Sequence, residues 1–181
     1  LVATRKQPEL VLPDGIAFAF EPRQRLRIEL DDTATGAVQT MTLELEAAPG
    51  NAPDSREAVV EHVALPSVAL RPNAVAVIDD YITMPAKLDG AGYFAFVGHT
   101  GRHGVGVRIA VATDASSDKI PVYLPIVFDW AAPPMSTIAP RTLPANGRFY
   151  VQCAYYNETV DDIGDELCGF WAYSSMSEAM R

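Results

Sequence analysis

This chain of 181 residues has little of what many catalytic and nucleic-acid-binding sites are built from. It contains three histidines and two cysteines, and its 23 acidic residues outnumber 14 Lys and Arg, which gives a net charge of −9. No cluster of Lys and Arg interrupts that negative field. A phosphate backbone would be repelled, so nucleic acid is excluded as a partner. No window approaches the roughly 18 uninterrupted apolar residues of a spanning helix, so no transmembrane segment is predicted in this chain.

Several sequence motifs are also missing. Ser and His do not have the spacing of a nucleophile elbow, and there is no Gly-rich phosphate loop. Serine hydrolases and nucleotide-binding enzymes are therefore not indicated. The chain begins at Leu1 rather than Met and shows no signal-peptide pattern, so we expect a processed chain or a piece of a longer one.

Strand-like alternation of apolar and polar residues runs through the chain. Residues 25–30 and 41–46 place polar side chains at every second position, and the polar link between them favours an antiparallel pair. The 14 prolines and 12 glycines would interrupt helices. We predict an all-β fold, an antiparallel, jelly-roll-like β-sandwich stapled by a disulfide. Its further strands are expected at 18–20, 59–64, 75–82, 93–99, 105–111, 122–128, 148–156 and 167–173.

The length and the 49% hydrophobic content suit one domain with a proper core. Residues 47–56 are the most linker-like stretch, but the segment before them holds too few strands to fold alone. We therefore expect a long loop there. The predicted organisation is N-terminal strands at residues 1–46, packed on a β-sandwich at residues 47–181.

The two cysteines are predicted to pair. Cys153 and Cys168 flank an acidic, Gly-containing loop at a spacing that suits opposite strands of one hairpin. A disulfide closing this loop would stabilise the fold by roughly 3 kcal/mol in the chain-entropy model. It would also imply an oxidising compartment, so a periplasmic or extracellular location is expected.

The loop between the cysteines carries two further patterns. Asn157, Glu158 and Thr159 form a glycosylation sequon, which has meaning in a eukaryotic secreted protein. Four acidic residues follow at 161, 162, 165 and 166, and their oxygens are ligands that Ca²⁺ accepts. Their spacing is not that of a dedicated calcium loop, so a solvated acidic loop is the preferred interpretation.

Two stretches of the chain resemble a known copper site. One reads His99, Thr100, Gly101 after residues 94–98, and the other reads Glu166, Leu167, Cys168 after a C-x-Y-x-N pattern at 153–157. With the Pro-containing turn at 13–15, this ordered series resembles the second domain of the copper type II, ascorbate-dependent monooxygenases, the peptidylglycine α-hydroxylating group. The resemblance covers about residues 12–175. The family pairs the two corresponding cysteines, which supports the disulfide.

The resemblance implies copper-ligand positions that this chain has lost. The family reads H-T-H and E-M-C, so Gly101 stands in place of the second histidine and Leu167 in place of the methionine. Asp31 stands where a histidine of the first domain's copper site is expected. Two histidines at i and i+2 of a strand can hold one ion, but only His99 remains here. The resemblance therefore predicts the fold and argues against the reaction.

The implied substrate pocket is also changed. Arg and Tyr side chains that help hold a peptide carboxylate in the hydroxylating members correspond to Val97 and Trp171 here. An apolar residue cannot pair that carboxylate. The aromatic residues Phe128, Trp130 and Phe170 are interpreted as core, together with Trp171.

We predict a non-catalytic structural or accessory subunit, in which the β-sandwich serves protein–protein interaction. The subunit would belong to an extracytoplasmic assembly, and a membrane-associated assembly is one alternative. The implied partner is another protein or a multi-subunit complex. In this chain we expect no catalytic residue, resident metal or other cofactor. Pro-rich extended segments at 131–134 and 143–144 favour such contacts. If the protein is an enzyme, it is a copper-dependent monooxygenase, or the remnant of one, whose other half lies elsewhere.

The alternative is a copper-binding module at His99. The residues that could bind the same copper ion beside His99 are His103, His62 or a methionine such as Met84 or Met135. His103 follows His99 by four positions, about 13 Å along an extended strand. A shared site would therefore need a turn between the two histidines.

Overall fold

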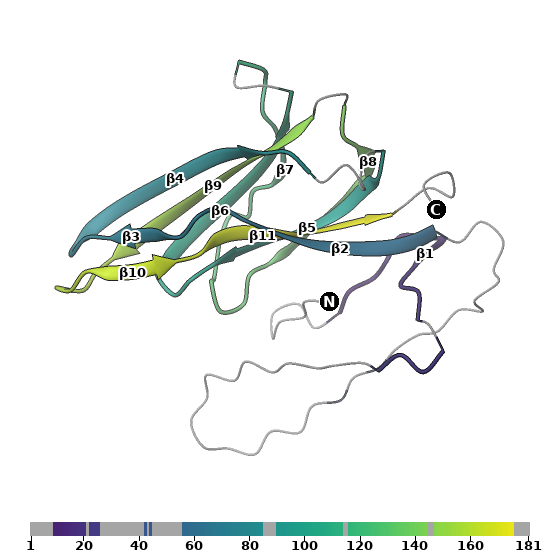
Figure 1. The fold of residues 1–181 in the computed structure, drawn as a ribbon, viewed down its shortest axis with the longest axis horizontal. Coiled ribbons are helices and arrows are strands. Elements are labelled where there is room, and N and C mark those ends of the chain that lie inside the picture. The colour runs from purple at the N-terminus through teal and green to yellow at the C-terminus, as the bar shows by residue number, and fades with distance from the viewer. Residues whose placement is uncertain are drawn as a thin grey trace.

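The computed structural model describes residues 9–20, 22–25, 42, 44, 56–84, 90–113, 116–144 and 147–175. Within these ranges the regular secondary structure is β-strand, and no helix is long and apolar enough to cross a membrane. The predicted all-β fold is confirmed. The strands are β1 (Ile16–Ala17), β2 (Arg56–Ala64), β3 (Val68–Leu70), β4 (Ala74–Ile82), β5 (Gly92–Thr100), β6 (Gly104–Ala112), β7 (Ile120–Tyr123), β8 (Met135–Thr142), β9 (Arg148–Asn157), β10 (Ile163–Glu166) and β11 (Cys168–Ser175) (Figure 1).

The strands form two facing sheets and a two-stranded ribbon (Figure 1). One sheet has the order β1-β2-β11-β5-β8 and the other has the order β4-β9-β6-β7, while β10 pairs with β3. The short β1 runs parallel to β2, and the other strand pairs are antiparallel. The architecture is therefore a β-sandwich, as the alternation of the sequence predicts.

Aromatic rings fill the core between the two sheets. Phe149 of β9 contacts Phe96 of β5 and Phe170 of β11, and each pair of ring centroids is 5.5 Å apart. All three side chains are fully buried. Removing such rings from water is the main source of stability in a sandwich of this size. The core also explains the alternation, because every second residue of these strands points into it.

The Cys153–Cys168 disulfide crosses this core. It is present and fully buried, so the predicted bond is confirmed. The predicted hairpin is wrong, because Cys153 lies on β9 of the four-stranded sheet and Cys168 on β11 of the five-stranded sheet. The intervening chain forms β10, which pairs with β3 instead of joining β9 to β11. The bond therefore ties the two sheets together.

A second, smaller apolar cluster lies on the outer face of the five-stranded sheet. Phe94 and Tyr173 are buried there beneath Leu10, Leu12 and Ile16 of the N-terminal segment. A register shift in β5 breaks the strict alternation and gives Phe94 an outward position. The segment at residues 9–20 thus covers part of this face.

Some strand predictions need correction. Residues 18–20 form no strand, and β1 comes just before them, paired with Arg56 and Glu57. The strand expected at 122–128 ends at Tyr123, since Pro125 lacks the N–H needed to continue the pairing. Strands β3, β8 and β10 were not predicted. The expected strands at 25–30 and 41–46 lie outside the described residues apart from positions 25, 42 and 44, and Asp31 lies outside them entirely.

Candidate functional site

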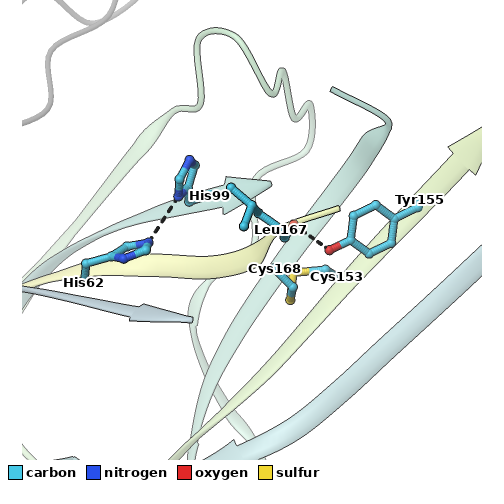
Figure 2. The surroundings of a disulfide bond; sticks show 6 residues. All are labelled: His62, His99, Cys153, Tyr155, Leu167 and Cys168. Atoms are coloured by element: carbon cyan, nitrogen blue, oxygen red, sulfur yellow. Dashed lines mark hydrogen bonds between the residues drawn. A yellow bond between two sulfur atoms is a disulfide. The ribbon is translucent and has the colours of Figure 1, made fainter. Parts of the chain in front are cut away.

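The predicted ligand positions on β5 and beside β11 lie next to one another. In the pairing of these strands, His99 is opposite Gly169, and the Gly101 N–H donates a hydrogen bond to the Leu167 carbonyl at 3.3 Å. Gly101 directly follows β5 and Leu167 directly precedes β11, so the three positions lie at the same end of this strand pair. Figure 2 shows His99 and Leu167 at this end of β11.

The residues at these positions do not fit a copper ion. Gly101 has no donor, and a Cβ atom built there would clash with the carboxylate of Glu166. The Leu167 side chain has no donor either, and it is exposed to solvent. Of these three positions, only His99 offers a metal ligand, where the copper sites of the resembling family use two histidines and a methionine. No catalytic step through copper can be built on these three positions.

His103 and Glu166 form a hydrogen-bonded pair beside Gly101. His103 Nδ1 lies 2.6 Å from Glu166 Oε1, and both side chains are largely removed from solvent. The other carboxylate oxygen, Oε2, and the Thr100 hydroxyl are buried without a hydrogen-bond partner. Glu166 therefore does not belong to a solvated loop. Its side chain fills the space that a residue larger than glycine would need at position 101.

Tyr155 connects this pair to the core near the disulfide. Its hydroxyl donates a hydrogen bond of 2.7 Å to the Leu167 carbonyl (Figure 2). Burial, and secondarily the Glu166 carboxylate, raise the pKa of Tyr155 well above its ordinary range. The hydroxyl thus stays protonated and holds the turn before β11 in place.

A different pair of histidines meets across β11. His62 of β2 and His99 of β5 lie on either side of that strand, with His62 Nε2 only 3.1 Å from His99 Nδ1 (Figure 2). Trp171 of β11 is directly opposite His62, and their ring centroids are 4.4 Å apart. The two imidazoles therefore rest beside an indole ring on the outer face of the five-stranded sheet.

The electrostatics of this pair favour neutral rings. Burial lowers the pKa of His99 below the ordinary value of 6.5. His62 is exposed on one side, and partial burial of its ring lowers its pKa as well, with a further contribution from the neighbouring His99. At pH 7 both imidazoles are therefore uncharged, and one nitrogen of the 3.1 Å contact donates its proton to the other.

The other candidate copper ligands predicted from the sequence, His103, Met84 and Met135, have other contacts than the His62–His99 pair. His103 is engaged with Glu166, whereas His99 faces His62. Met84 is part of the core between the sheets, and Met135 packs into the outer cluster. Among the described residues, no group of three or more His, Cys, Asp or Glu gathers in the manner of a multi-ligand metal site.

The two positions that correspond to substrate-pocket residues of the resembling family also meet, on the outer face of the five-stranded sheet. Val97 and Trp171 lie directly opposite one another on β5 and β11. Val97 is buried in the outer cluster, and Trp171 is partly buried against it. Phe170 is core as expected. Trp130, interpreted as core from the sequence, is instead 37% exposed.

The sequon asparagine has a structural role. Asn157 is fully buried, and its Nδ2 donates to the carbonyls of Arg71 at 2.9 Å and Asp161 at 2.8 Å, with a longer contact to Leu70. Its Oδ1 accepts from the Thr159 N–H and hydroxyl. This nitrogen is not accessible to a glycosylating enzyme in the folded protein. The sequence reasoning missed this role because the partners lie on other segments.

Comparisons with known proteins assign this chain to no family. No protein-family model matches it, and no curated protein matches it.

Proposed function

We propose that this protein is a non-catalytic, extracytoplasmic β-sandwich subunit that binds another protein through the outer face of its four-stranded sheet. The observation that carries this proposal is an exposed apolar surface, here called the valine face, formed by Val75, Val77, Val105 and Tyr156. Their exposed fractions are 71%, 55%, 54% and 46%. An exposed group of aliphatic and aromatic side chains on a sheet is typical of a protein-binding surface.

The valine face spans three neighbouring strands. Val75 of β4 lies directly opposite Tyr156 of β9, and Val77 lies opposite Ala154, so these side chains share one side of the sheet. Val105 is on the next strand, β6. A rigid sheet presents such side chains with little loss of conformational entropy when a partner docks.

Farther along the same strands, the outer face of the four-stranded sheet becomes polar. Asp79 and Gln152 are paired there, Arg108 lies opposite Gln152, and the Lys119 ammonium sits 4.0 Å from the centre of the Tyr150 ring. An apolar centre beside a polar margin is the usual anatomy of a protein interface. The net charge of −9 favours a partner with a basic margin, which would speed the encounter.

The non-catalytic part of the proposal is supported by the residue types at the positions resembling a copper site. Gly101 and Leu167 offer no ligand, and Glu166 occupies the space beside Gly101. The extracytoplasmic location is supported by the buried disulfide, because such bonds persist in oxidising compartments.

The experiment is quantitative capture of partners from the extracytoplasmic fraction of the source cells under mild conditions. A Val75→Ser/Val77→Ser variant should reduce recovery of the partner at least about tenfold, or ~1.4 kcal/mol in binding free energy. Ile120→Ser, an exposed aliphatic position on β7 at the opposite edge of the same sheet, is the matched control and should behave as wild type. A chain that is always isolated as a lone monomer, or capture that the double variant leaves unchanged, would contradict the proposal.

A further inference from the structure

The two facing nitrogens of the His62–His99 pair are separated by a distance that two ligands of one metal ion can have. Imidazole nitrogens bind such ions at about 2.0–2.1 Å, so two of them at an angle between square-planar and tetrahedral are about 2.8–3.4 Å apart. The observed separation of His62 Nε2 and His99 Nδ1 is 3.1 Å. One ion could therefore reach both nitrogens in place of the shared proton, once each ring turns so that its lone pair points at the ion.

The sheet brings these two nitrogens together by its strand order. His62 and His99 are 37 residues apart and lie on β2 and β5, which are separated by β11. The residue opposite His99 on β11 is Gly169, so no side chain of that residue stands between the two histidines. Trp171 contacts both rings, with centroids 4.4 Å from His62 and 6.5 Å from His99. The pair is thus held by three strands rather than by a loop.

We propose that His62 and His99 together form a binding site for a first-row divalent transition-metal ion, with Cu²⁺ held more tightly than Zn²⁺. Imidazole donors suit these ions, and the general order of affinity places Cu²⁺ above Zn²⁺. Hard ions such as Ca²⁺ and Mg²⁺ prefer oxygen ligands and are rejected. His62 is exposed, so water completes the coordination. One of the two facing nitrogens carries the hydrogen-bond proton, so that ring must take its other tautomer before both lone pairs can bind the ion.

This site shares only His99 with the positions in the copper resemblance, because its second ligand is His62 and neither Gly101 nor Leu167 contributes. It is also independent of the valine face, which lies on the other sheet. Failure of one proposal therefore leaves the other intact.

The test is titration of the full chain with Cu²⁺, Zn²⁺ and Mg²⁺, one at a time, by calorimetry and by quenching of tryptophan fluorescence. We expect one Cu²⁺ per chain, weaker Zn²⁺ binding and no Mg²⁺ binding. Trp171 is beside the pair, so Cu²⁺ should quench emission, and a Trp171→Phe variant should lose most of that quenching while it still binds the ion.

His62→Gln and His99→Gln should each weaken Cu²⁺ binding at least about tenfold. His103→Gln is the matched control, because this third histidine is engaged with Glu166, and it should bind like wild type. If either glutamine variant fails to fold, electron paramagnetic resonance of the wild-type Cu²⁺ complex decides, with coupling to two imidazole nitrogens expected. No stoichiometric binding, binding that both variants retain, or coupling to fewer than two imidazoles would overturn the site.

Discussion

The two outer faces of this sandwich differ in what covers them. On the five-stranded sheet, the segment at residues 9–20 lies over Phe94 and Tyr173 and buries them. On the four-stranded sheet, Val75 and Tyr156 are similar in apolar character and remain exposed. The chain thus supplies its own cover for one face and none among the described residues for the other. This difference between the two faces is the observation on which the proposed protein-binding role of the valine face rests.

The largest expected effect comes from shortening a side chain on the covered face. Phe94→Ala should lower the free energy of unfolding by about 3–5 kcal/mol, because it leaves a cavity beneath the N-terminal segment. Val75→Ala, on the bare face, should change it by less than about 0.5 kcal/mol. Urea unfolding of both variants measures this difference. Equal, small losses would show that the segment at residues 9–20 does not bury Phe94 in solution.

A somewhat smaller loss of stability is expected from changes at Asn157, the last residue of β9 in the four-stranded sheet. Asn157→Asp replaces the Nδ2 donor with an acceptor that faces three carbonyls, so it should cost roughly 2–3 kcal/mol. Thr159→Ala removes a hydroxyl that donates to Asn157 Oδ1 and makes longer contacts with the Asp161 backbone, and it should cost roughly 1 kcal/mol. Both variants destroy the sequon. Equal stability of the two, measured by thermal unfolding of unglycosylated protein, would refute the structural role of Asn157.

The stability of the protein should depend on pH through the His62–His99 pair, which lies on the outer face of the five-stranded sheet. Their folded-state pKa values are lowered, so the unfolded chain takes up protons first as the pH falls below 6.5. Their contribution to stability is therefore complete above that value. It is progressively lost as the pH falls from 6.5 toward the lowered values.

Urea unfolding at a series of pH values between 8 and about 5 measures this decline. A His62→Gln/His99→Gln variant should show a flatter profile over this range than wild type. Superimposable profiles would mean that the histidine pair carries no pH dependence.

The sequence predicted the sandwich from alternation, and its failures follow from physical causes. Strand β8 was missed because Pro140 and exposed polar residues obscure its pattern, which an edge strand tolerates. Strand β10 has two adjacent acidic residues, and β3 has three residues in all. Short or polar strands owe their pairing to neighbours that local periodicity does not reveal.

The candidate site was predicted in part. The motifs placed His99, Gly101 and Leu167 together, and the strand register brings them together. His62 was one of several candidate partners of His99, but its spacing gave no reason to choose it, because the two are 37 residues apart and their contact depends on the strand order β2-β11-β5. The same holds for His103 and Glu166, which are 63 residues apart. Cross-strand register, and not spacing along the chain, decides such pairs.

The valine face had no sequence signal of its own. Val75 and Val77 fit the alternation of a half-buried strand equally well with either face inward. Only the packing of the alternate residues, Ala76 and Ile78, against the core shows that these valines point away from it.

The most direct test of the central claim is hydroxyl-radical footprinting of the natively isolated assembly against the isolated chain. The account predicts that Tyr156, now 46% exposed, and its neighbour Val75 lose reactivity in the assembly. Trp171, on the outer face of the other sheet, should keep its reactivity. Unchanged reactivity of Tyr156 and Val75 in an assembly that contains this chain would contradict the claim that the valine face binds the partner.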